Sequence, residues 1–559
     1  MRLDWESCPQ KGSIGFLDFS KATLQKLLRE LEDDRRATRA GHVPNKHVPN
    51  KEEGRYETPL PLVRYIAKKT ATFLLANNKN TKAPLTIVDP ATGDGRFVHE
   101  TDAALGSLND TRQRRFVSFD VSPAAPTPKK LSGNSTWEHL VEDALESSVL
   151  KEHVADLVIG NPPYVGGLHM APKTRAHYQG RYLASSVGDW NLYGLFLEQG
   201  YRWLKPGGLL AMVVPSSWKR AEFAKPLRDY FKQEKALAGI VDFADHQVFS
   251  EATTYSSIVF LRKCLSEKTQ GIAHATLHEK SWNIEKRPQT NAFLMSSVLG
   301  HTKTQPLLSK VESVSTCVKD FFSIYKGSGT GANALFVQRK NSSLLIQEEC
   351  WRPVWQGREL GRRQEPSHMI ALPYGPTGIL LSPMELEYLH PMTWEYFRGH
   401  RDALGAREKG KFHGRSFYAF GRSNSLVKAL APNERLLIPD VFKRIRITLD
   451  SAHHFFLDSV LAVEVRPDFE GAAKKPLEAL RLLLESELCK SWLSFYGSPL
   501  KGGYTRMTPK AVSRVPFPES LLDGDLKDPE LLNRAFDIPL SQWNPKYANV
   551  SEEGISTPV

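Results

Sequence analysis

The sequence predicts an α/β fold class: a doubly wound parallel sheet with an antiparallel last strand, followed by a domain of the α+β type. Three observations lead to this prediction. Short apolar, β-rich runs alternate with helical stretches from about residue 56 to 262. The alternation is lost after about residue 265. The chain's 559 residues are enough for two large domains with an arm or tail.

The first predicted elements precede the sheet. Residues 21–36 place leucines on one face of an amphipathic helix, for which we expect a packing role rather than a binding role. A tandem duplication of His-Val-Pro-Asn-Lys follows at residues 42–51. Its two prolines and its lack of apolar periodicity predict a linker.

Six apolar runs then predict the strands of the sheet, and the stretches between most of them predict its helices. The strands are expected at 85–88, 116–119, 154–159, 209–214, 238–243 and 257–261. The helices include 60–76, 189–204 and 219–235. A strand between residues 120 and 143 is poorly defined, because three prolines interrupt that segment. No long helix separates the last two strands, so we expect the final strand to run antiparallel.

Composition and charge exclude several classes of protein. The chain is 41% apolar and 24% charged, which rules out a mostly disordered protein. Its 74 Lys and Arg residues against 62 Asp and Glu residues give a net charge of +12. Most of that excess follows residue 260. We therefore expect a polyanionic partner, with nucleic acid ahead of an anionic membrane surface.

Other compositional features bear on location and on metals. No apolar run approaches the ~18–20 residues of a membrane span. The N-terminus carries early acids and no apolar core, so we expect no export signal and a cytoplasmic location. The five cysteines lie far apart, without metal-ligand or redox spacing, so we expect reduced thiols and no metal.

The first chemical signal is the run Asp-Pro-Ala-Thr-Gly-Asp-Gly-Arg-Phe at residues 89–97. An apolar strand ends in an acid, and a glycine-rich turn then opens a helix, as at ligand sites on the carboxyl edge of a doubly wound sheet. The run lacks the third glycine of the dinucleotide fingerprint and the Gly-Lys-Ser/Thr of a phosphate loop. It favours a ligand with a positive group or hydroxyls over a pyrophosphate; the alternative is a tight structural turn.

The second signal is Asn-Pro-Pro-Tyr at residues 161–164, again directly after an apolar strand. The two prolines fix the backbone and hold Asn161 extended. Its amide oxygen and a backbone carbonyl then form a rigid pair of acceptors for an amino group. Tyr164 supplies a flat face for stacking.

Together these motifs resemble the amino-methyltransferases that use S-adenosyl-L-methionine, specifically the type II, gamma-class DNA adenine-N6 methyltransferases of restriction-modification systems. The resemblance touches most of residues 54–518. Gly-Arg-Tyr-Glu-Thr-Pro at 54–59 is similar to the family's motif ten, and Val-Phe-Ser at 248–250 is similar to motif eight. Residues 325–331, 354–359 and 501–509 resemble landmarks of the target-recognition region.

The resemblance implies a Rossmann-like methyltransferase sheet and a chain in four parts. These are an N-terminal helix and linker (1–53), an S-adenosylmethionine-dependent catalytic domain (54–265), a target-recognition, DNA-binding domain (266–530) and a tail (531–559).

The resemblance also implies roles for residues at the matching motif positions. Asp120 is expected on the cofactor's ribose hydroxyls and Asp143 on its adenine amino group. Catalysis is expected at Asn161, Pro162 and Tyr164, with Tyr164 and Phe249 stacking on the target base. The full set of expected cofactor-binding residues is Thr58, Pro59, Asp89, Ala91, Thr92, Gly93, Gly95, Phe97, Asp120 and Asp143.

In the second domain, basic clusters interleaved with aromatic residues predict contacts with duplex DNA. The candidates are Arg398, Arg401, Arg415, Arg422, Lys443, Arg444, Lys501, Arg506 and Lys510. We expect a monomer that methylates double-stranded DNA to protect it from a separately encoded restriction endonuclease.

Other functions remain open at this point. The same motifs occur in methyltransferases acting on an RNA base or a protein glutamine amide, and a DNA-binding module with a vestigial catalytic domain is a further alternative. A fused nuclease is not expected, because only about 50 residues precede motif ten and they show no metal-binding Asp…Glu-x-Lys arrangement.

Overall fold

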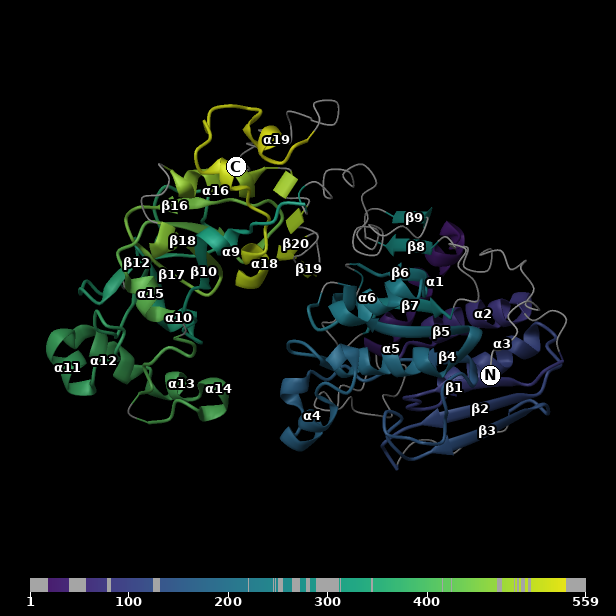
Figure 1. The fold of residues 1–559 in the computed structure, drawn as a ribbon. Helices are drawn as coiled ribbons and strands as arrows, with labels where there is room; N and C mark the ends of the chain where they lie inside the picture. Colours follow the sequence, from purple (N-terminus) through teal and green to yellow (C-terminus); the bar gives the residue numbers. More distant parts are fainter. Residues whose placement is uncertain are drawn as a thin grey trace. The chain divides into compact units, whose positions relative to one another are not determined.

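The computed structural model divides the chain into two compact units, Met1–His301 and Thr302–Val559, which are called here the N-terminal and C-terminal units. Each is described by itself (Figure 1). The structure describes residues 19–39, 57–77, 82–123, 131–219, 221–244, 246, 248–249, 255–263, 272–277, 282–287, 311, 313–342, 345–414, 416–423, 425–469, 475–486, 488–489, 492–493, 498–500 and 504–538. The duplication at 42–51 lies outside these residues.

A nine-stranded sheet forms the N-terminal unit, in the order β3-β2-β1-β4-β5-β7-β6-β8-β9. Its strands are β1 (Leu85–Asp89), β2 (Arg114–Phe119), β3 (Ser135–Leu140), β4 (Ala155–Gly160), β5 (Leu204–Pro215), β6 (Leu237–Asp242), β7 (Ser256–Arg262), β8 (Ile272–Leu277) and β9 (Trp282–Arg287). The five strands from β3 to β5 pair in parallel, which confirms the predicted fold class.

Three features of the sheet bear on the sequence predictions. β7 runs antiparallel between β5 and β6, as expected. The poorly defined third strand exists as β3 and pairs along its whole length with β2. Two strands that were not predicted, β8 and β9, continue the same sheet beyond residue 265, where the catalytic domain was expected to end.

Helices cover both faces of this sheet (Figure 1). They include α1 (Lys21–Arg39), α2 (Leu60–Asn77), α3 (Arg96–Ser107), α4 (Pro172–Tyr178), α5 (Leu192–Trp203) and α6 (Lys225–Gln233). Consecutive strand residues belong to different cores: Ile87 packs with α1, α2 and α3, whereas Val88 packs with α5 and α6. Successive strand side chains point to opposite faces, so both must be apolar when both faces are buried.

The helix α1 has the packing role that its pattern predicted. Leu24 and Leu27 are almost fully buried and belong to the same core as residues of α2 and α3. Among the helices of the described residues, none combines the length and the apolar character needed to cross a membrane.

The order of the strands fixes where a ligand can bind. The chain passes from β1 outward to β2 and β3, then returns to place β4 on the other side of β1. The connections after β1 and β4 therefore diverge at one point of the carboxyl edge. Ligands of open α/β sheets bind at such a topological switch point.

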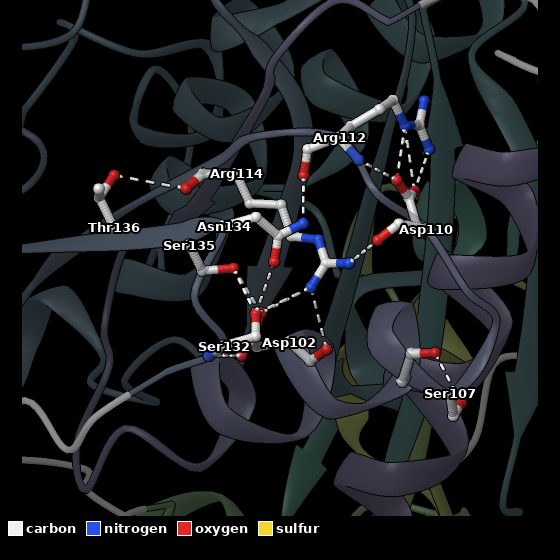
Figure 2. Close-up of polar contacts among 10 residues, drawn as sticks. Asp102, Ser107, Asp110, Arg112, Arg114, Ser132, Asn134, Ser135 and Thr136 are labelled. Carbon is white, nitrogen blue, oxygen red and sulfur yellow. Dashed lines mark hydrogen bonds and ion pairs between the residues drawn. The ribbon is translucent and has the colours of Figure 1, made fainter.

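At the opposite, amino edge, a buried polar network joins α3 to the starts of β2 and β3 (Figure 2). Arg114 donates to Asp102 Oδ1 over 2.8 Å, and the hydroxyls of Ser132 and Ser135 donate to the same oxygen over 2.7 and 2.6 Å. Burial would raise the pKa of Asp102, but these donors outweigh it and hold that pKa below its ordinary value. These hydrogen bonds compensate for the burial of the charged Asp102 carboxylate.

The described residues of the C-terminal unit form three smaller sheets. Their orders are β10-β18-β14-β16, β11-β13-β12-β17 and β15-β20-β19. The strands are β10 (Phe322–Lys326), β11 (Val337–Arg339), β12 (Trp351–Trp355), β13 (His368–Ala371), β14 (Arg435–Pro439), β15 (Val441–Phe442), β16 (Thr448–Asp450), β17 (Phe455–Phe456), β18 (Val460–Val465), β19 (Ser498–Leu500) and β20 (Tyr504–Arg506).

Short helices lie around these sheets, so the α+β prediction for this part of the chain is confirmed. They are α9 (Val318–Phe321), α10 (Asn333–Phe336), α11 (Pro383–Leu389), α12 (Pro391–Gly399), α13 (Arg401–Gly405), α14 (Arg407–Gly410), α15 (Leu426–Leu430), α16 (Pro476–Glu485), α18 (Pro509–Ser513) and α19 (Leu531–Ala535). Arg435 of β14 is fully buried against Asp450 and Glu464 and donates to three backbone carbonyls.

We predict that Asp102→Ala destabilises the N-terminal unit by roughly 3–5 kcal/mol, because it leaves the Arg114 guanidinium buried without its carboxylate. Urea denaturation measures the free energy of unfolding, and hydrogen exchange of peptides from β2 in the native protein measures the local effect. Glu138→Ala is the matched control: it removes an exposed pair with Arg115 on the same strands and should cost less than about 1 kcal/mol. Equal effects of the two variants would contradict the prediction.

Candidate functional site at the carboxyl edge

The loop after β1 is held in shape by its own backbone and by the end of β2. Thr92 donates its N–H to the carbonyl of Phe119 over 2.8 Å, and Gly95 donates to the carbonyl of Thr92 over 2.9 Å. Gly93 and Gly95 have φ of 54° and 78°, a left-handed backbone that favours glycine. The predicted glycine-rich turn therefore exists and leads directly into α3.

Asp120, the residue after β2, reaches the same loop. Its Oδ2 accepts the N–H of Gly93 over 3.0 Å, while its Oδ1 accepts the N–H of Ser122 over 2.8 Å. The neighbouring Val121 is 62% exposed. The structure thus brings the two predicted cofactor residues Asp120 and Gly93 together, beside an exposed apolar side chain.

Asp89 ends β1 and is almost fully buried. Its Oδ1 accepts the N–H of Ala91 over 3.2 Å, and its Oδ2 has no hydrogen-bond partner among the described residues. Burial raises the pKa of this carboxyl group to about 7, and the carboxylates of Asp120 and Asp94 add to the rise. A buried carboxylate with an unpartnered oxygen suits a cationic or hydrogen-donating ligand.

Gly160, which the sequence analysis did not single out, lets β4 pass close to this carboxylate. A Cβ at this position would lie 2.8 Å from Asp89 Oδ1. Gly95 is constrained in the same way, because a Cβ there would lie 2.6 Å from the ring of Trp137 on β3. A glycine that ends a buried strand signals such a close approach, so Gly160 could have been recognised from the sequence.

Asn161 follows Gly160 and begins the proline-stiffened loop. Its Oδ1 accepts the hydroxyl of Tyr164 over 2.7 Å, and that hydroxyl also lies 3.2 Å from the carbonyl oxygen of Val213 on β5. The sequence predicted a stacking face at Tyr164 but not this hydrogen bond. An amide oxygen carries two lone pairs and can accept two hydrogen bonds.

The rings of Tyr164, Tyr193 and Phe249 form an aromatic cluster. The rings of Phe249 and Tyr193 lie edge-on to that of Tyr164, with centroids 6.3 and 6.1 Å away. Phe249 is only 2% exposed. The structure therefore brings together the two residues expected to stack on a target base, and Tyr193 joins them.

A buried ion pair lies at the carboxyl ends of β5 and β6. The ammonium group of Lys219 contacts Asp242 Oδ2, and Ser216 donates to Asp242 Oδ1 over 2.8 Å. Burial would raise the pKa of Asp242, but the charge of Lys219 and the hydrogen bonds from Lys219, Ser216 and the Ala244 N–H together outweigh it and hold that pKa below its ordinary value. The pair ties the loop after β5 to the segment after β6, which leads to Phe249.

The remaining predicted cofactor residues occupy less direct positions. Asp143 accepts the hydroxyl of Tyr178 over 2.6 Å and the N–H of Leu145 over 2.9 Å. Thr58 is buried just before α2, and the carbonyl of Pro59 accepts N–H groups of the first turn of that helix. Phe97 is buried in the core. Motif-ten residues 54–56 lie outside the described residues.

The predicted DNA-contacting residues are scattered over the C-terminal unit. Arg398 pairs with Glu395 over 3.2 Å, and Arg422 pairs with Asp458 over 3.0 Å. Arg401 lies over the ring of Phe417, 4.9 Å from its centroid. Arg415 and Lys501 lie outside the described residues.

Four of the candidates gather near the three-stranded sheet β15-β20-β19 and the helix that follows it. Val441 and Arg506 are register partners, and Lys443 lies 4.9 Å from the ring centroid of the half-exposed Tyr504. Arg444 is half-buried on the same connection, and Lys510 is exposed on α18. Basic groups beside an exposed aromatic ring suit a nucleic-acid backbone.

The aromatic residues between 397 and 422 have a different role from the one their interleaving with basic residues suggested. Phe397, Phe417, Tyr418 and Phe420 are all buried in one core. Arg407, in the middle of this stretch, donates to the backbone carbonyls of Thr330, Leu404, Phe417 and Ala419. Part of the basic-aromatic pattern is therefore packing rather than a binding surface.

The fold also brings together residues that cysteine spacing did not connect. Ligand atoms of Glu348, Cys350 and His390 lie within 4.8 Å of one another. Glu348 accepts the N–H groups of Met392 and Thr393 over 2.8 and 2.9 Å, so it caps α12. Burial raises the pKa of the Cys350 thiol to about 11, which favours the protonated form. Helix capping accounts for the position of Glu348.

Comparison with known proteins agrees with the geometry. Residues 111–249 match the family of Eco57I restriction-modification methylases. Among curated relatives, the type II restriction enzyme and methyltransferase RM.Eco57I of Escherichia coli is 22% identical over 410 residues, covering 66% of this chain and 41% of the relative. The type II methyltransferase M.PaeR7I of Pseudomonas aeruginosa is 21% identical over 384 residues, covering 65% and 64%. The chain thus spans less than two thirds of either relative.

Among solved structures, the chain resembles the type IIL restriction-modification enzyme MmeI in complex with DNA. The TM-score is 0.55 at 15% identity, over 82% of this chain and 65% of that one. At this identity the likeness concerns the fold alone.

We predict that Gly160→Ala weakens binding of the expected cofactor at least about tenfold, because the new methyl group displaces the Asp89 carboxylate. Isothermal titration with S-adenosylmethionine measures the affinity. Gly106→Ala in α3 is the matched control, since nothing lies within 4 Å of the added Cβ. A Gly160→Ala protein with normal affinity would show that Asp89 does not touch the ligand site.

The raised pKa of Asp89 predicts a pH-dependent affinity. Below about pH 7 the carboxyl group is protonated and neutral, and above it the group is ionised and attracts a cation. A bound cation favours ionisation, so affinity should rise with pH through this value and then level off. The measurement is the ratio of wild-type to Asp89→Asn affinities for S-adenosylmethionine from about pH 6 to 8. The ratio removes the ligand's own titration, and a flat ratio would contradict the assignment.

Proposed function

We propose that this chain, whose residues 111–249 belong to the Eco57I restriction-modification methylase family, transfers a methyl group from S-adenosylmethionine to N6 of an adenine in a specific DNA sequence. The observation that carries the proposal is the pairing of two loops at the switch point. One holds Asp89, Gly93 and the neighbouring Asp120, and the other holds Asn161 to Tyr164. A cofactor loop thus lies beside an acceptor for an amino group.

The residues of the first loop fit the proposed cofactor. Asp89 offers a buried oxygen without a partner among the described residues to a positive group, and Asp120, beside the exposed Val121, would accept hydroxyls. Space is open at Gly93, where nothing lies within 4 Å of an added Cβ. S-adenosylmethionine supplies an activated, positively charged methyl donor when bound.

The second loop fits the target amine. The exocyclic nitrogen of adenine is a poor nucleophile, because its lone pair is delocalised into the ring. Asn161 Oδ1 and the carbonyl of Pro162 would accept its two N–H groups and turn the lone pair out of the ring plane. This is orientation combined with charge stabilisation, and it needs no strong base, because the proton can leave after transfer.

The aromatic cluster fits a base taken out of the helix. A target inside duplex DNA must swing out at a cost of a few kcal/mol, and stacking on an aromatic ring offsets part of that cost. Tyr164 is only partly buried and packs against both cores of the sheet, which supports a stacking role for its ring. Phe249, whose ring lies edge-on to that of Tyr164, would support the Tyr164 ring or stack on the base directly.

The C-terminal unit is proposed to supply the DNA contacts, and the basic groups beside Tyr504 are the best-placed candidates. The biological role that follows is protection of host DNA from a restriction endonuclease carried on a separate chain. A monomer suffices for methylation of one strand at a time.

The direct test is methylation of plasmid DNA with labelled S-adenosylmethionine, followed by sequencing that detects N6-methyladenine. We expect label at one consistent sequence motif. Label confined to RNA or to protein would contradict the proposal and make an RNA base or a protein amide the substrate. N4-methylcytosine in the DNA would show that the target base is cytosine rather than adenine.

We predict that Asn161→Ala lowers the methylation rate by at least about 10²-fold while S-adenosylmethionine affinity changes little, because the acceptor for the amine is lost and the cofactor loop is not. Single-turnover methylation and isothermal titration measure the two effects. Tyr164→Phe keeps the ring and removes the hydroxyl that fixes the Asn161 amide, so its rate should fall less. A near-normal rate in Asn161→Ala would show that the mechanism is wrong.

A further inference from the structure

One arginine joins the proposed cofactor loop after β1 to residues 57–58, which precede α2. Arg96 is the first residue of α3, and its Nε lies 2.8 and 2.7 Å from the two carboxylate oxygens of Asp94. The other end of the same guanidinium donates to Glu57 over 3.1 Å and to the backbone carbonyl of Thr58. Arg96 therefore bridges the glycine-rich loop and the residues that precede α2.

Each contact lies at a sensitive position. Asp94 stands between Gly93 and Gly95, the two residues of left-handed backbone, so holding its side chain restrains the loop. Its Oδ1 also accepts the backbone N–H of Arg96 over 3.2 Å. Thr58 is 4% exposed, and its carbonyl would be a buried acceptor without Arg96.

The chemistry of the side chain suits this bridge. A guanidinium presents donors in a rigid planar fork, which can meet a carboxylate and further acceptors at once, whereas an ammonium group is a single point of charge. Burial would lower the pKa of Arg96, but the carboxylates of Asp94 and Glu57 outweigh it and raise that pKa. The cation is thus retained although its side chain is only 21% exposed.

We propose that Arg96 is a positioning residue that fixes the start of α2 against the cofactor loop and so preorganises the cofactor site. The inference rests on the proposed function for the identity of the ligand. Arg96 touches neither the aromatic cluster nor Asn161, and it acts through Asp94, Glu57 and Thr58. Its loss should weaken cofactor binding more than it slows transfer at saturating cofactor.

The test compares Arg96→Met with Arg64→Met. Arg64 of α2 pairs with Glu100 of α3 over 3.2 Å, so the control removes another arginine link between the same two helices, away from the loop. We expect Arg96→Met to raise the Kd for S-adenosylhomocysteine about tenfold, and Arg64→Met to leave it within about twofold. Arg96→Lys should restore only part of the affinity.

A second measurement needs no ligand. In the ligand-free protein, hydrogen exchange of peptides covering residues 57–63 and 92–98 should speed up together in Arg96→Met and stay unchanged in Arg64→Met. The loss of stability in the double variant Glu57→Gln, Arg96→Met should be smaller than the sum of the losses in the two single variants, because both substitutions remove the same contact. Thermal melting checks that each variant is folded.

The outcomes separate the two proposals. Unchanged exchange and unchanged affinity in a folded Arg96→Met protein would overturn the positioning role. An affinity loss of the same size in Arg64→Met would also overturn it, since the effect would then be general loosening of α2 and α3. If the wild-type chain binds no S-adenosylhomocysteine, the proposed function fails, and the ligand-free exchange still decides whether Arg96 couples the two segments.

Discussion

Burial of the Asp89 carboxylate at the switch point is the constraint on which the site depends. The strand β1 must end between β2 and β4, where both faces of the sheet are covered, and it ends in an acid. Room for that acid exists because β4 ends in Gly160. The next residue is Asn161, so the same backbone approach that accommodates the carboxylate also sets the position of the amide. The loop after β1 and the loop after β4 are thereby placed by one contact.

The two edges of the sheet treat buried acids in opposite ways. At the amino edge, Asp102 is surrounded by donors and its pKa is lowered. At the carboxyl edge, the pKa of Asp89 is raised, and one of its oxygens lacks a partner among the described residues. The arrangement around Asp102 stabilises the fold. The arrangement around Asp89 leaves a carboxylate oxygen to which a ligand could donate a hydrogen bond. Proteins concentrate such unsatisfied groups at functional sites.

The sheet was predictable because its strands carry a strong local signal. Runs buried on both faces are continuously apolar, and the loops that follow β1 and β4 carry unusual side chains at a defined edge. The strand β3 was hidden because it lies at the edge of the sheet and is only partly buried, and because four of its six residues are polar or charged. β8 and β9 are also peripheral, and their pairing is set by the sheet rather than by their own composition.

Side-chain partners in the site were less accessible from sequence. That Arg96 contacts Glu57 depends on how α2 packs beside α3, and that Tyr164 bonds Asn161 depends on a rotamer. In the C-terminal unit the arginines of one basic stretch separate into surface groups and the buried Arg407, although their sequence surroundings are alike. Burial is decided by long-range packing, which no local pattern encodes.

The antiparallel insertion of β7 has a consequence for how such a site could change over time. β6 ends at Asp242 and β7 begins at Ser256, and these ends are neighbours on the same edge as the site. The connection between them starts and finishes at that edge, whereas a connection between parallel strands must cross to the opposite edge. The length of this connection can therefore change without altering the pairing of β6 with β7. The sheet thus offers a place at its carboxyl edge where the surroundings of Tyr164 can diversify while the loops after β1 and β4 stay as they are.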